Sequence, residues 1–150
     1  MMHNEIVSRS PDETFQIGEQ IGRELRRGDV VLLYGSLGAG KTLFTKGILN
    51  ALEFDTDEVT SPSFALVNLY TAGGFAVYHI DLWRLETSMN VAFSVGLDEI
   101  LENERSVVII EWADKLGEYL FPSRMITVRI EGDGDEPRNI SVDIAAPTKI

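Results

Sequence analysis

The sequence contains no cysteine, which excludes disulfide bonds and metal sites built on cysteine. Its two histidines, His3 and His79, are too few and too far apart in sequence to indicate a metal cluster. No apolar run approaches the roughly 20 residues that a helix needs to cross a bilayer, so we expect no membrane segment. These absences suit a cytoplasmic protein, and the cytoplasm is the location that we expect.

Basic residues are also scarce, with 13 Lys and Arg against 24 Asp and Glu and a net charge of −11. Nucleic-acid binding usually depends on a basic surface that releases counterions from phosphates. Arg23, Arg26 and Arg27 could form a local basic patch, but we interpret them as the solvated face of a helix. The charge balance therefore disfavours direct binding of RNA or DNA and favours a partner protein that carries the basic surface.

The length of 150 residues and the hydrophobic content of 44% predict a single domain, residues 1–150, with a sizeable core. The first predicted helix begins after Ser10, which forms a capping box with Glu13, while Pro11 takes the first helical position. Apolar residues then recur at four-residue spacing, at Ile17, Ile21 and Leu25. We expect Gly28 to end this helix.

Runs of apolar and β-branched residues predict the strands, and two further stretches favour helix. The expected strands cover residues 30–34, 64–70, 75–80, 107–110, 125–131 and 139–144, and the expected helices cover 43–52 and 97–103. Short glycine-containing turns join the second strand to the third and the fifth to the sixth, which predicts two antiparallel pairs. The uniformly apolar fourth strand indicates a parallel strand buried on both faces. The sequence therefore predicts an α/β fold whose mixed sheet includes antiparallel hairpin strands.

The segment Gly35–Thr42 reads G-x-x-x-x-G-K-T and lies between an apolar strand-like run and a helix-forming stretch. This order is the context of a phosphate-binding loop. Gly35 and Gly40 let the backbone curl so that its N–H groups point at phosphates, and the helix N-terminus adds a partial positive charge. Lys41 would reach the β- and γ-phosphates, and the Thr42 hydroxyl would bind Mg²⁺.

The loop predicts that the protein binds a nucleoside triphosphate. The expected contacts run along the whole motif and into the helix: Gly35, Ser36, Leu37, Gly38, Ala39, Gly40, Lys41, Thr42 and Leu43. The alternative is a plain glycine-rich turn between a strand and a helix.

Asp81 and Glu111 each follow an apolar strand, and Glu111 completes the hhhhE form of a second ATPase motif. Ligands of open α/β sheets collect at the carboxyl ends of the strands, where such acids could hold Mg²⁺ or orient water. The sequence leaves open which of the two does which, and whether either is instead a helix cap or a turn residue. His79 is expected to be packed rather than catalytic. Five other aspartates are interpreted as solvated surface: Asp57, Asp98, Asp114, Asp133 and Asp135.

Residues 59–64 form a hydroxyl-rich turn that includes Ser61 and Ser63. This turn is either simple loop chemistry or a switch segment whose hydroxyl senses the γ-phosphate and Mg²⁺. Trp112, directly after Glu111, is either packed in the core or its rim, or exposed as a contact for a partner.

Several segments occur in one order along the chain: Gly35–Thr42, Thr60–Phe64, Leu66–Tyr70, Tyr78–Leu85, Gly96–Glu99 and Ile110–Trp112. Together they resemble the TsaE (YjeE) family, small bacterial ATPases needed to make threonylcarbamoyladenosine in tRNA, over roughly residues 10–142. The resemblance implies a P-loop NTPase-like three-layer fold, Mg²⁺-dependent ATP hydrolysis that is weak in the isolated protein, and a cytoplasmic location. It also implies assembly with the threonylcarbamoyl transferase subunit TsaD and its partner TsaB, with tRNA engaged only indirectly.

The resemblance also assigns roles to matching positions. Lys41 and Thr42 match the phosphate and Mg²⁺ contacts, Glu111 matches the acid that helps to hold Mg²⁺, and Asp81 matches an acid needed for turnover. The expected catalytic residues are therefore Asp81, Glu111 and Lys41, and the expected metal ligands are Thr42 and Glu111. Trp112 matches a tryptophan that follows the second acid. Thr14 and Arg138 resemble nucleotide contacts near the start of the chain and in its last hairpin.

Three positions depart from the family pattern. Ser36 replaces the usual Asp of G-D-L-G, which removes a negative charge beside the phosphates and leaves the nucleotide affinity open. Ser63 replaces the usual Thr of S-P-T, and Trp83 replaces the usual Tyr of D-L-Y-R.

Two rival functions use the same loop. A small-molecule or nucleotide kinase would need a second pocket and an arginine-bearing lid, for which Arg84 and Arg105 are isolated candidates. Transfer of ³²P to an acceptor rather than to water would favour the kinase. A GTP-operated switch would carry N-K-x-D for guanine, and no asparagine of this chain is followed by lysine. Nucleotide competition would separate GTP from ATP binding.

Overall fold

The computed structural model describes residues 2–36, 38–55, 67–72, 75–85 and 90–149. Within these ranges the strands are β1 (Met2–Ser8), β2 (Val30–Tyr34), β3 (Val67–Ala72), β4 (Phe75–Asp81), β5 (Ser106–Glu111), β6 (Met125–Glu131) and β7 (Arg138–Ala145). The helices are α1 (Pro11–Glu24), α2 (Lys41–Ala51), α3 (Val91–Val95), α4 (Leu97–Leu101) and the short 3₁₀ helix η2 (Ala113–Leu116). Among the described residues, the structure contains no helix with the length and apolar character to cross a membrane.

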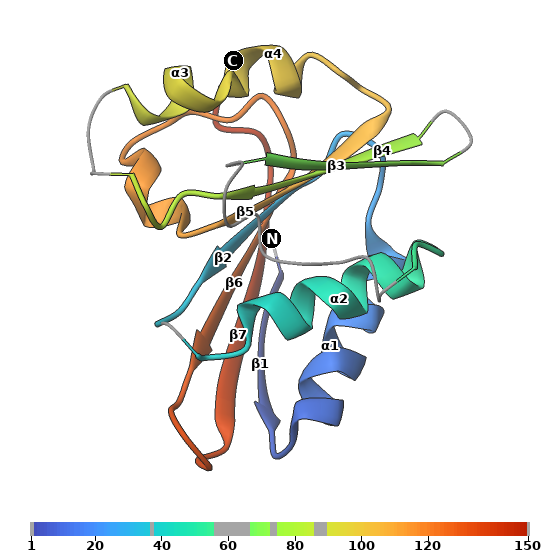
Figure 1. Ribbon diagram of the computed structural model, residues 1–150, viewed down its shortest axis with the longest axis vertical. Helices are drawn as coiled ribbons and strands as arrows, with labels where there is room; N and C mark the ends of the chain where they lie inside the picture. Colours follow the sequence, from blue (N-terminus) through green and yellow to red (C-terminus); the bar gives the residue numbers. More distant parts are fainter. Residues whose placement is uncertain (1, 37, 56–66, 73–74, 86–89, 150) are drawn as a thin grey trace.

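The strands form one seven-stranded mixed sheet in the order β1-β7-β6-β2-β5-β4-β3 (Figure 1). The four central strands β6, β2, β5 and β4 run parallel. Antiparallel partners extend the sheet at both sides, with β3 beside β4, and β7 and then β1 beside β6. The predicted α/β fold with a mixed sheet and antiparallel hairpins is confirmed.

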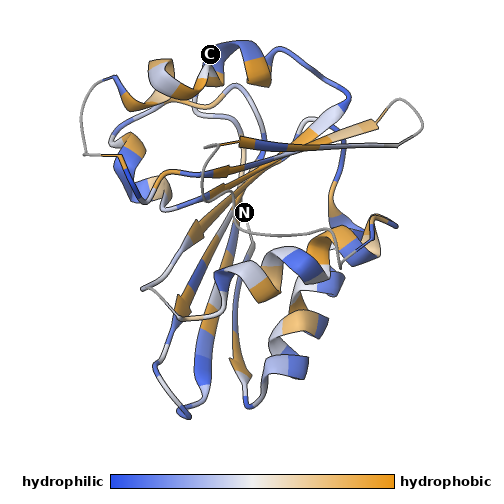
Figure 2. Ribbon diagram, in the orientation of Figure 1, coloured by the Kyte–Doolittle hydropathy of each residue, from blue (hydrophilic) through white to orange (hydrophobic). Residues whose placement is uncertain are grey.

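Helices cover both faces of the sheet, which gives the three layers that the resemblance implied. On one face, α1 and α2 pack on alternate residues of the central strands, including Val31 and Leu33. On the other face, α3, α4 and η2 pack on the residues between them, including Leu32 and Ile110. Because the central strands are covered on both faces, they are largely hydrophobic, whereas the helices mix hydrophobic and hydrophilic positions (Figure 2).

Helices α1 and α2 cross in direct contact at their glycines. A Cβ atom on Gly47 would lie 2.2 Å from the carbonyl oxygen of Phe15, and one on Gly18 would lie 2.3 Å from that of Phe44. These separations are shorter than any non-bonded contact, so only glycine permits the helices to approach this closely. The crossing fixes α2, and with it the glycine-rich loop at its start.

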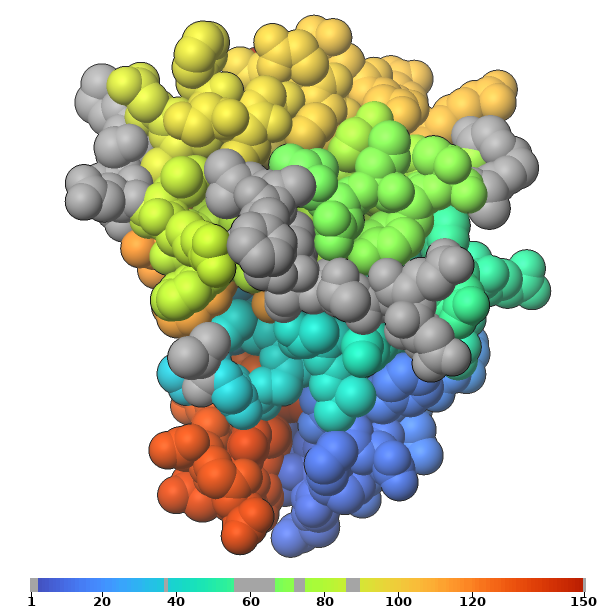
Figure 3. Space-filling model, viewed as in Figure 1, coloured from blue at the N-terminus to red at the C-terminus, as the bar shows by residue number. Residues whose placement is uncertain are grey.

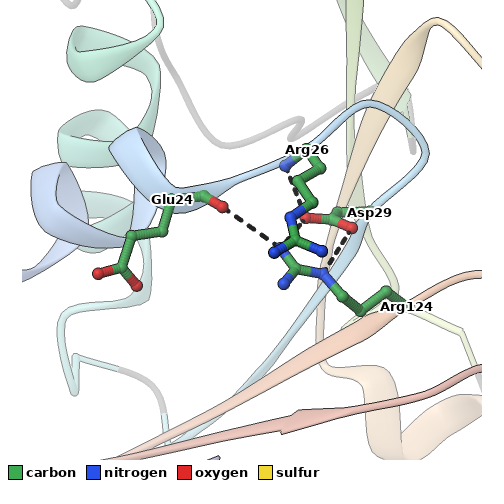
Figure 4. Close-up of polar contacts among 4 residues, drawn as sticks. All are labelled: Glu24, Arg26, Asp29 and Arg124. Carbon is green, nitrogen blue, oxygen red and sulfur yellow. Dashed lines mark hydrogen bonds and ion pairs between the residues drawn. The ribbon is translucent and has the colours of Figure 1, made fainter.

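The end of α1 differs from the prediction. The helix ends at Glu24, because Leu25 already has extended backbone (ψ 144°), and Gly28 lies in the following turn. Polar contacts hold the chain after the helix, as Figure 4 shows. The Arg124 guanidinium donates to the buried Asp29 carboxylate at 2.6 and 3.0 Å and to the Glu24 carbonyl at 3.3 Å. The Arg26 amide donates to the same aspartate at 2.7 Å. Arg26 and Arg27 therefore lie beyond the helix, and only Arg23 lies on it.

Three other elements were not predicted, namely β1, α3 and η2. The β1 strand pairs along its whole length with β7, from Met2 opposite Ile144 to Ser8 opposite Arg138. Its sequence mixes polar and apolar residues, so its strand conformation depends on this distant partner rather than on local propensity. The α3 helix has only five residues, and its Val91 packs on the sheet face that α4 and η2 also cover.

The carboxyl ends of the parallel strands meet at one edge of the sheet. Leu33 of β2 and Asp81 of β4 both lie opposite Glu111 of β5 in the sheet register. The turn after β2 leads directly into the glycine-rich loop, so both acidic residues and the loop share this edge. The site predicted from separate motifs thus has a common location.

Candidate nucleotide site

The backbone of the glycine-rich loop has the curvature that a phosphate cradle requires. Gly38 and Gly40 have φ values of 82° and 113°, a region that residues with a side chain rarely adopt. The Ala39 amide donates to the Ser36 carbonyl at 3.1 Å and closes the turn. Gly40 is the N-cap of α2 and has no side chain to offer its first N–H groups, so the helix start is suited to an anion. Leu37 lies outside the described residues.

Strand β6 packs closely against the first residue of the loop, Gly35. A Cβ atom on Gly35 would lie 2.7 Å from the Ile130 carbonyl oxygen of β6. The loop can therefore follow its path only with glycine at the end of β2.

Lys41 lies inside the loop with 5% of its surface exposed. Its ammonium donates to the carbonyls of Gly35 at 2.6 Å and Ser36 at 2.9 Å, and it lies 4.4 Å from the centre of the Trp112 ring. Burial lowers the pKa of Lys41, and the negative charges of Glu111, Asp81 and Asp114 oppose that change. A cation in this position is preorganised next to the loop and within the field of two buried carboxylates.

Asp81 and Glu111 are both buried at the sheet edge. Burial raises the pKa of Asp81, the backbone hydrogen bond from Trp83 lowers it, and the charge of Glu111 raises it again. The Trp83 amide donates to Asp81 Oδ1 at 3.1 Å, so Asp81 is also a turn residue, one of the alternatives left open by the sequence. The turn fixes the Asp81 carboxylate at the mouth of the site.

These groups line one cavity of about 490 Å³ at the mouth of the loop. The lining residues are Gly38, Gly40, Lys41, Thr42, Leu43, Asp81, Trp83, Arg84, Glu111 and Trp112. Trp112 is half-buried, with a left-handed backbone (φ 58°) that turns its ring over Lys41. Sequence reasoning missed Arg84, which had been treated as isolated, and placed no weight on Trp83 beyond its departure from the family pattern. Trp83 and Arg84 follow Asp81 by two and three residues, and this closeness in sequence could have indicated that they line the same site.

A second cavity of about 360 Å³ adjoins the other side of the loop. It is lined by Ser8, Arg9, Ser10, Pro11, Thr14, Gly38, Ala39, Gly40, Leu43, Gly134, Asp135, Glu136 and Arg138. Figure 3 shows the matching surface, with the end of the β6–β7 hairpin beside the start of α1 and the beginning of α2 next to both. The loop residues Gly38, Gly40 and Leu43 belong to both cavities.

Arg138 ties the last hairpin to the loop. Its guanidinium donates to the Ala39 carbonyl at 3.0 Å, to the Gly134 carbonyl at 3.0 Å and, at a longer 3.5 Å, to the Gly38 carbonyl. Thr14 is buried in the same cavity wall, where its hydroxyl lies 2.6 Å from the Ser8 hydroxyl. The structure thus brings both outlying candidates, Thr14 and Arg138, to the loop.

The side-chain oxygens of the site suit a Mg²⁺ ion that is bound jointly by the protein and by phosphate oxygens. They do not suit a metal ion held by protein side chains alone. Among the described residues, no group of three or more His, Cys, Asp or Glu side chains could enclose a metal ion. Thr42 and Glu111 nevertheless line the same cavity, and Mg²⁺ in nucleotide sites takes one or two such ligands together with phosphate oxygens and water. Ser61 and Ser63 of the predicted switch segment lie outside the residues that the structure describes.

A larger cavity of about 970 Å³ lies at the opposite edge of the sheet, around Arg26 and Arg124. It contains none of the loop residues and mixes basic with acidic side chains, including Asp98 and Glu102. The convergence of loop, lysine and acids therefore identifies the smaller pair of cavities as the candidate site.

Comparison with known proteins identifies the family. The model of the family described as "Threonylcarbamoyl adenosine biosynthesis protein TsaE" matches residues 8–140. The tRNA threonylcarbamoyladenosine biosynthesis protein TsaE of Treponema pallidum is 38% identical over 136 residues, which cover 91% of this chain and 97% of that protein. The protein of the same name from Bacillus subtilis is 36% identical over 132 residues, which cover 88% of this chain and 80% of that protein.

A solved structure agrees with the sequence comparisons. The crystal structure of Bacillus subtilis YdiB matches with a TM-score of 0.75 and 30% identity, over 97% of this chain and 87% of that one. The resemblance noted from the motifs is confirmed, and the chain belongs to the TsaE family.

Proposed function

We propose that this protein is a Mg²⁺-dependent ATPase that supports the synthesis of threonylcarbamoyladenosine in tRNA by acting on a complex of TsaD and TsaB. The observation that carries the ATPase proposal is the convergence of Lys41, Asp81 and Glu111 on the cavity at the mouth of the glycine-rich loop. The family description supports the pathway, since it names threonylcarbamoyladenosine biosynthesis.

The two cavities support a specific orientation of ATP. The triphosphate would lie along the loop toward Lys41, in the cavity that also holds Asp81 and Glu111. The nucleoside would lie on the other side, between Thr14 and Arg138. This arrangement uses the loop as the shared wall and gives each end of the nucleotide a cavity of its own.

The residues of the loop side have distinct roles in this proposal. Lys41 would exchange its bonds to the loop carbonyls for the phosphates, which carry more negative charge. Thr42 and Glu111 would hold Mg²⁺, which neutralises phosphate charge when it is bound. Asp81, fixed by its turn at the mouth of the cavity, would orient the attacking water.

The partner proposal rests on charge and on the position of Trp112. A chain with net charge −11 is poorly suited to bind tRNA directly, because the tRNA phosphates are also negative. TsaD and TsaB would contact the tRNA instead. Trp112 is half-buried against Lys41, and a partner that touched its outer face would contact the nucleotide site. We extend the proposal to Ser61 and Ser63 as a nucleotide-sensing segment, and to a cytoplasmic location.

Analytical ultracentrifugation with purified TsaD and TsaB homologues tests the partnership, in an ATP analogue, in ADP and without nucleotide. We expect a complex whose stability depends on the nucleotide, and we expect Trp112→Ala to weaken it more than it weakens ATP binding. The exposed Trp83 is the matched control, because Trp83→Ala removes an indole from the same cavity but not the one above Lys41. Equal sedimentation of free and mixed proteins under all three conditions would refute the partnership.

A second assay tests the reaction. Incubation with γ-³²P-ATP should release inorganic phosphate, and excess GTP should compete poorly. Transfer of the label to a small-molecule acceptor would instead show a kinase, and equal competition by GTP would show a protein without preference for adenine.

A further inference from the structure

His79 makes a polar contact at the base of the site that the proposed mechanism does not use. The imidazole is fully buried, with 0% of its side chain exposed, and its Nε2 lies 2.5 Å from Glu111 Oε2. The Glu111 side chain is only 3% exposed. His79 lies two residues before Asp81 on β4, so both side chains project from the same face of the strand as Glu111 does from β5. The three groups form one row at the sheet edge.

The geometry identifies the nitrogen that donates. Two lone pairs would face each other at 2.5 Å if Nε2 lacked a proton, since both oxygens of an ionised carboxylate only accept. Nδ1 is buried, and among the described residues it has no hydrogen-bond partner. A proton on Nδ1 would therefore leave a buried N–H unpaired, which proteins rarely tolerate. The proton therefore lies on Nε2, which donates to Glu111.

Packing alone does not account for this histidine. A buried imidazole with one unpaired nitrogen costs stability relative to an apolar side chain of similar volume. The neighbouring inward positions of the sheet, Val77 and Ile109, are apolar and fully buried. The contact with Glu111 is the hydrogen bond that this buried polar side chain makes among the described residues.

We infer that His79 is a positioning residue, whose Nε2–H fixes one oxygen of Glu111 so that the rest of the carboxylate faces the Thr42 and Lys41 side of the cavity. This inference rests on the proposed function, because it assumes that Glu111 acts on Mg²⁺. Hydrogen-bond donors behind metal-binding side chains commonly contribute 10- to 100-fold to metal affinity or activity. His79 touches neither nucleotide nor metal and acts only through Glu111.

Two substitutions separate positioning from packing. His79→Gln keeps an N–H donor near the position of Nε2, whereas His79→Leu keeps most of the volume and removes the donor. His3→Gln is the control, because His3 is exposed and pairs with Asp143 in the outer strands. The readouts are the Mg²⁺ concentration for half-maximal ATP binding by calorimetry, ATP binding in EDTA, and the thermal midpoint.

His79→Leu should raise the half-saturating Mg²⁺ concentration by about 10- to 100-fold while ATP binding in EDTA changes less than about twofold. His79→Gln should recover most of the loss, and His3→Gln should match the wild-type chain. The inference is overturned if His79→Leu leaves the Mg²⁺ dependence unchanged, or if the Gln and Leu variants lose equally. A wild-type chain that shows no Mg²⁺-dependent ATP binding would overturn the proposed function instead.

A measurement on the unsubstituted residue covers the case in which His79→Leu does not fold. The chain has only two histidines, so in ¹⁵N-histidine-labelled His3→Gln protein all imidazole signals come from His79. Nuclear magnetic resonance should show Nε2 protonated and hydrogen-bonded, with a signal that shifts in Glu111→Gln. A spectrum with the proton on Nδ1, or one unchanged by Glu111→Gln, would overturn the inference without reference to ATP.

Discussion

Replacing Arg138 by methionine tests whether the last hairpin preorganises the glycine-rich loop for nucleotide. Methionine keeps an unbranched apolar stem but removes the donors to the carbonyls of Ala39 and Gly38. It also removes the donors to the hairpin carbonyls of Gly134 and Glu136. The bond to Ala39 is part-buried and charge-assisted, a class worth about 1.5–3 kcal/mol. The 3.5 Å contact to Gly38 is too long to add much.

If that stabilisation acts on the loop conformation that binds nucleotide, its loss lowers ATP affinity by about 10- to 100-fold, since 1.4 kcal/mol corresponds to tenfold. Arg138→Lys should recover little, because an ammonium cannot reproduce the planar fork of donors. Isothermal titration with Mg·ATP measures the affinity, and thermal unfolding checks the fold.

Arg105→Met is the matched control, since it removes the same charge from an exposed position just before β5, at the edge of the sheet away from the loop. An ATP affinity of Arg138→Met within twofold of wild type would show that the contact with Ala39 does not preorganise the loop. Equal losses in both variants would show that net charge, and not the contact with the loop, is responsible.

Three further predictions concern the acids and the helix crossing. Asp81→Asn and Glu111→Gln should keep the fold and most ATP binding yet lower turnover by about 10²- to 10³-fold, as measured by phosphate release, and near-normal turnover in both would remove the acids from the mechanism. Burial raises the pKa of Asp81, so the folded chain holds that proton more tightly than the unfolded chain, and stability falls as pH rises from the ordinary carboxyl range through the raised pKa. Asp81→Asn should therefore raise the thermal midpoint at pH 7 and show less of this decline, and a lower midpoint would contradict the assigned burial cost. Gly47→Ala places a Cβ atom 2.2 Å from the Phe15 carbonyl oxygen and should lower the free energy of unfolding by more than about 2 kcal/mol in urea titrations, whereas a change within about 0.5 kcal/mol would show that the helices separate easily.

Local signals were sufficient to predict the central part of the fold. The glycine-rich loop, the apolar runs and the turn residues predicted the parallel strands, the two hairpins and the start of α1. The same signals brought Asp81 and Glu111 to one edge, because acids at the ends of parallel strands must meet there. These features depend on residues close together in sequence or on a general rule of sheet topology.

Features that depend on distant residues could not be predicted in this way. The β1 strand is defined by its pairing with β7, and the last residue of α1, Glu24, is contacted by Arg124 a hundred residues later. His79 was interpreted as packed, and it is buried, but its contact with Glu111 required the register of β4 against β5. Propensity reports on the local backbone and contains no information about such long-range contacts.

The proposed function requires the glycine-rich loop to bind ATP through Lys41. Isothermal titration of Mg·ATP into the wild-type chain and into Lys41→Ala measures this requirement, because the substitution removes the ammonium that the loop encloses. We expect saturable binding of one nucleotide per wild-type chain, and affinity weakened by at least about 100-fold in a Lys41→Ala protein that remains folded. Unchanged affinity in the folded variant would show that Lys41 does not bind the nucleotide.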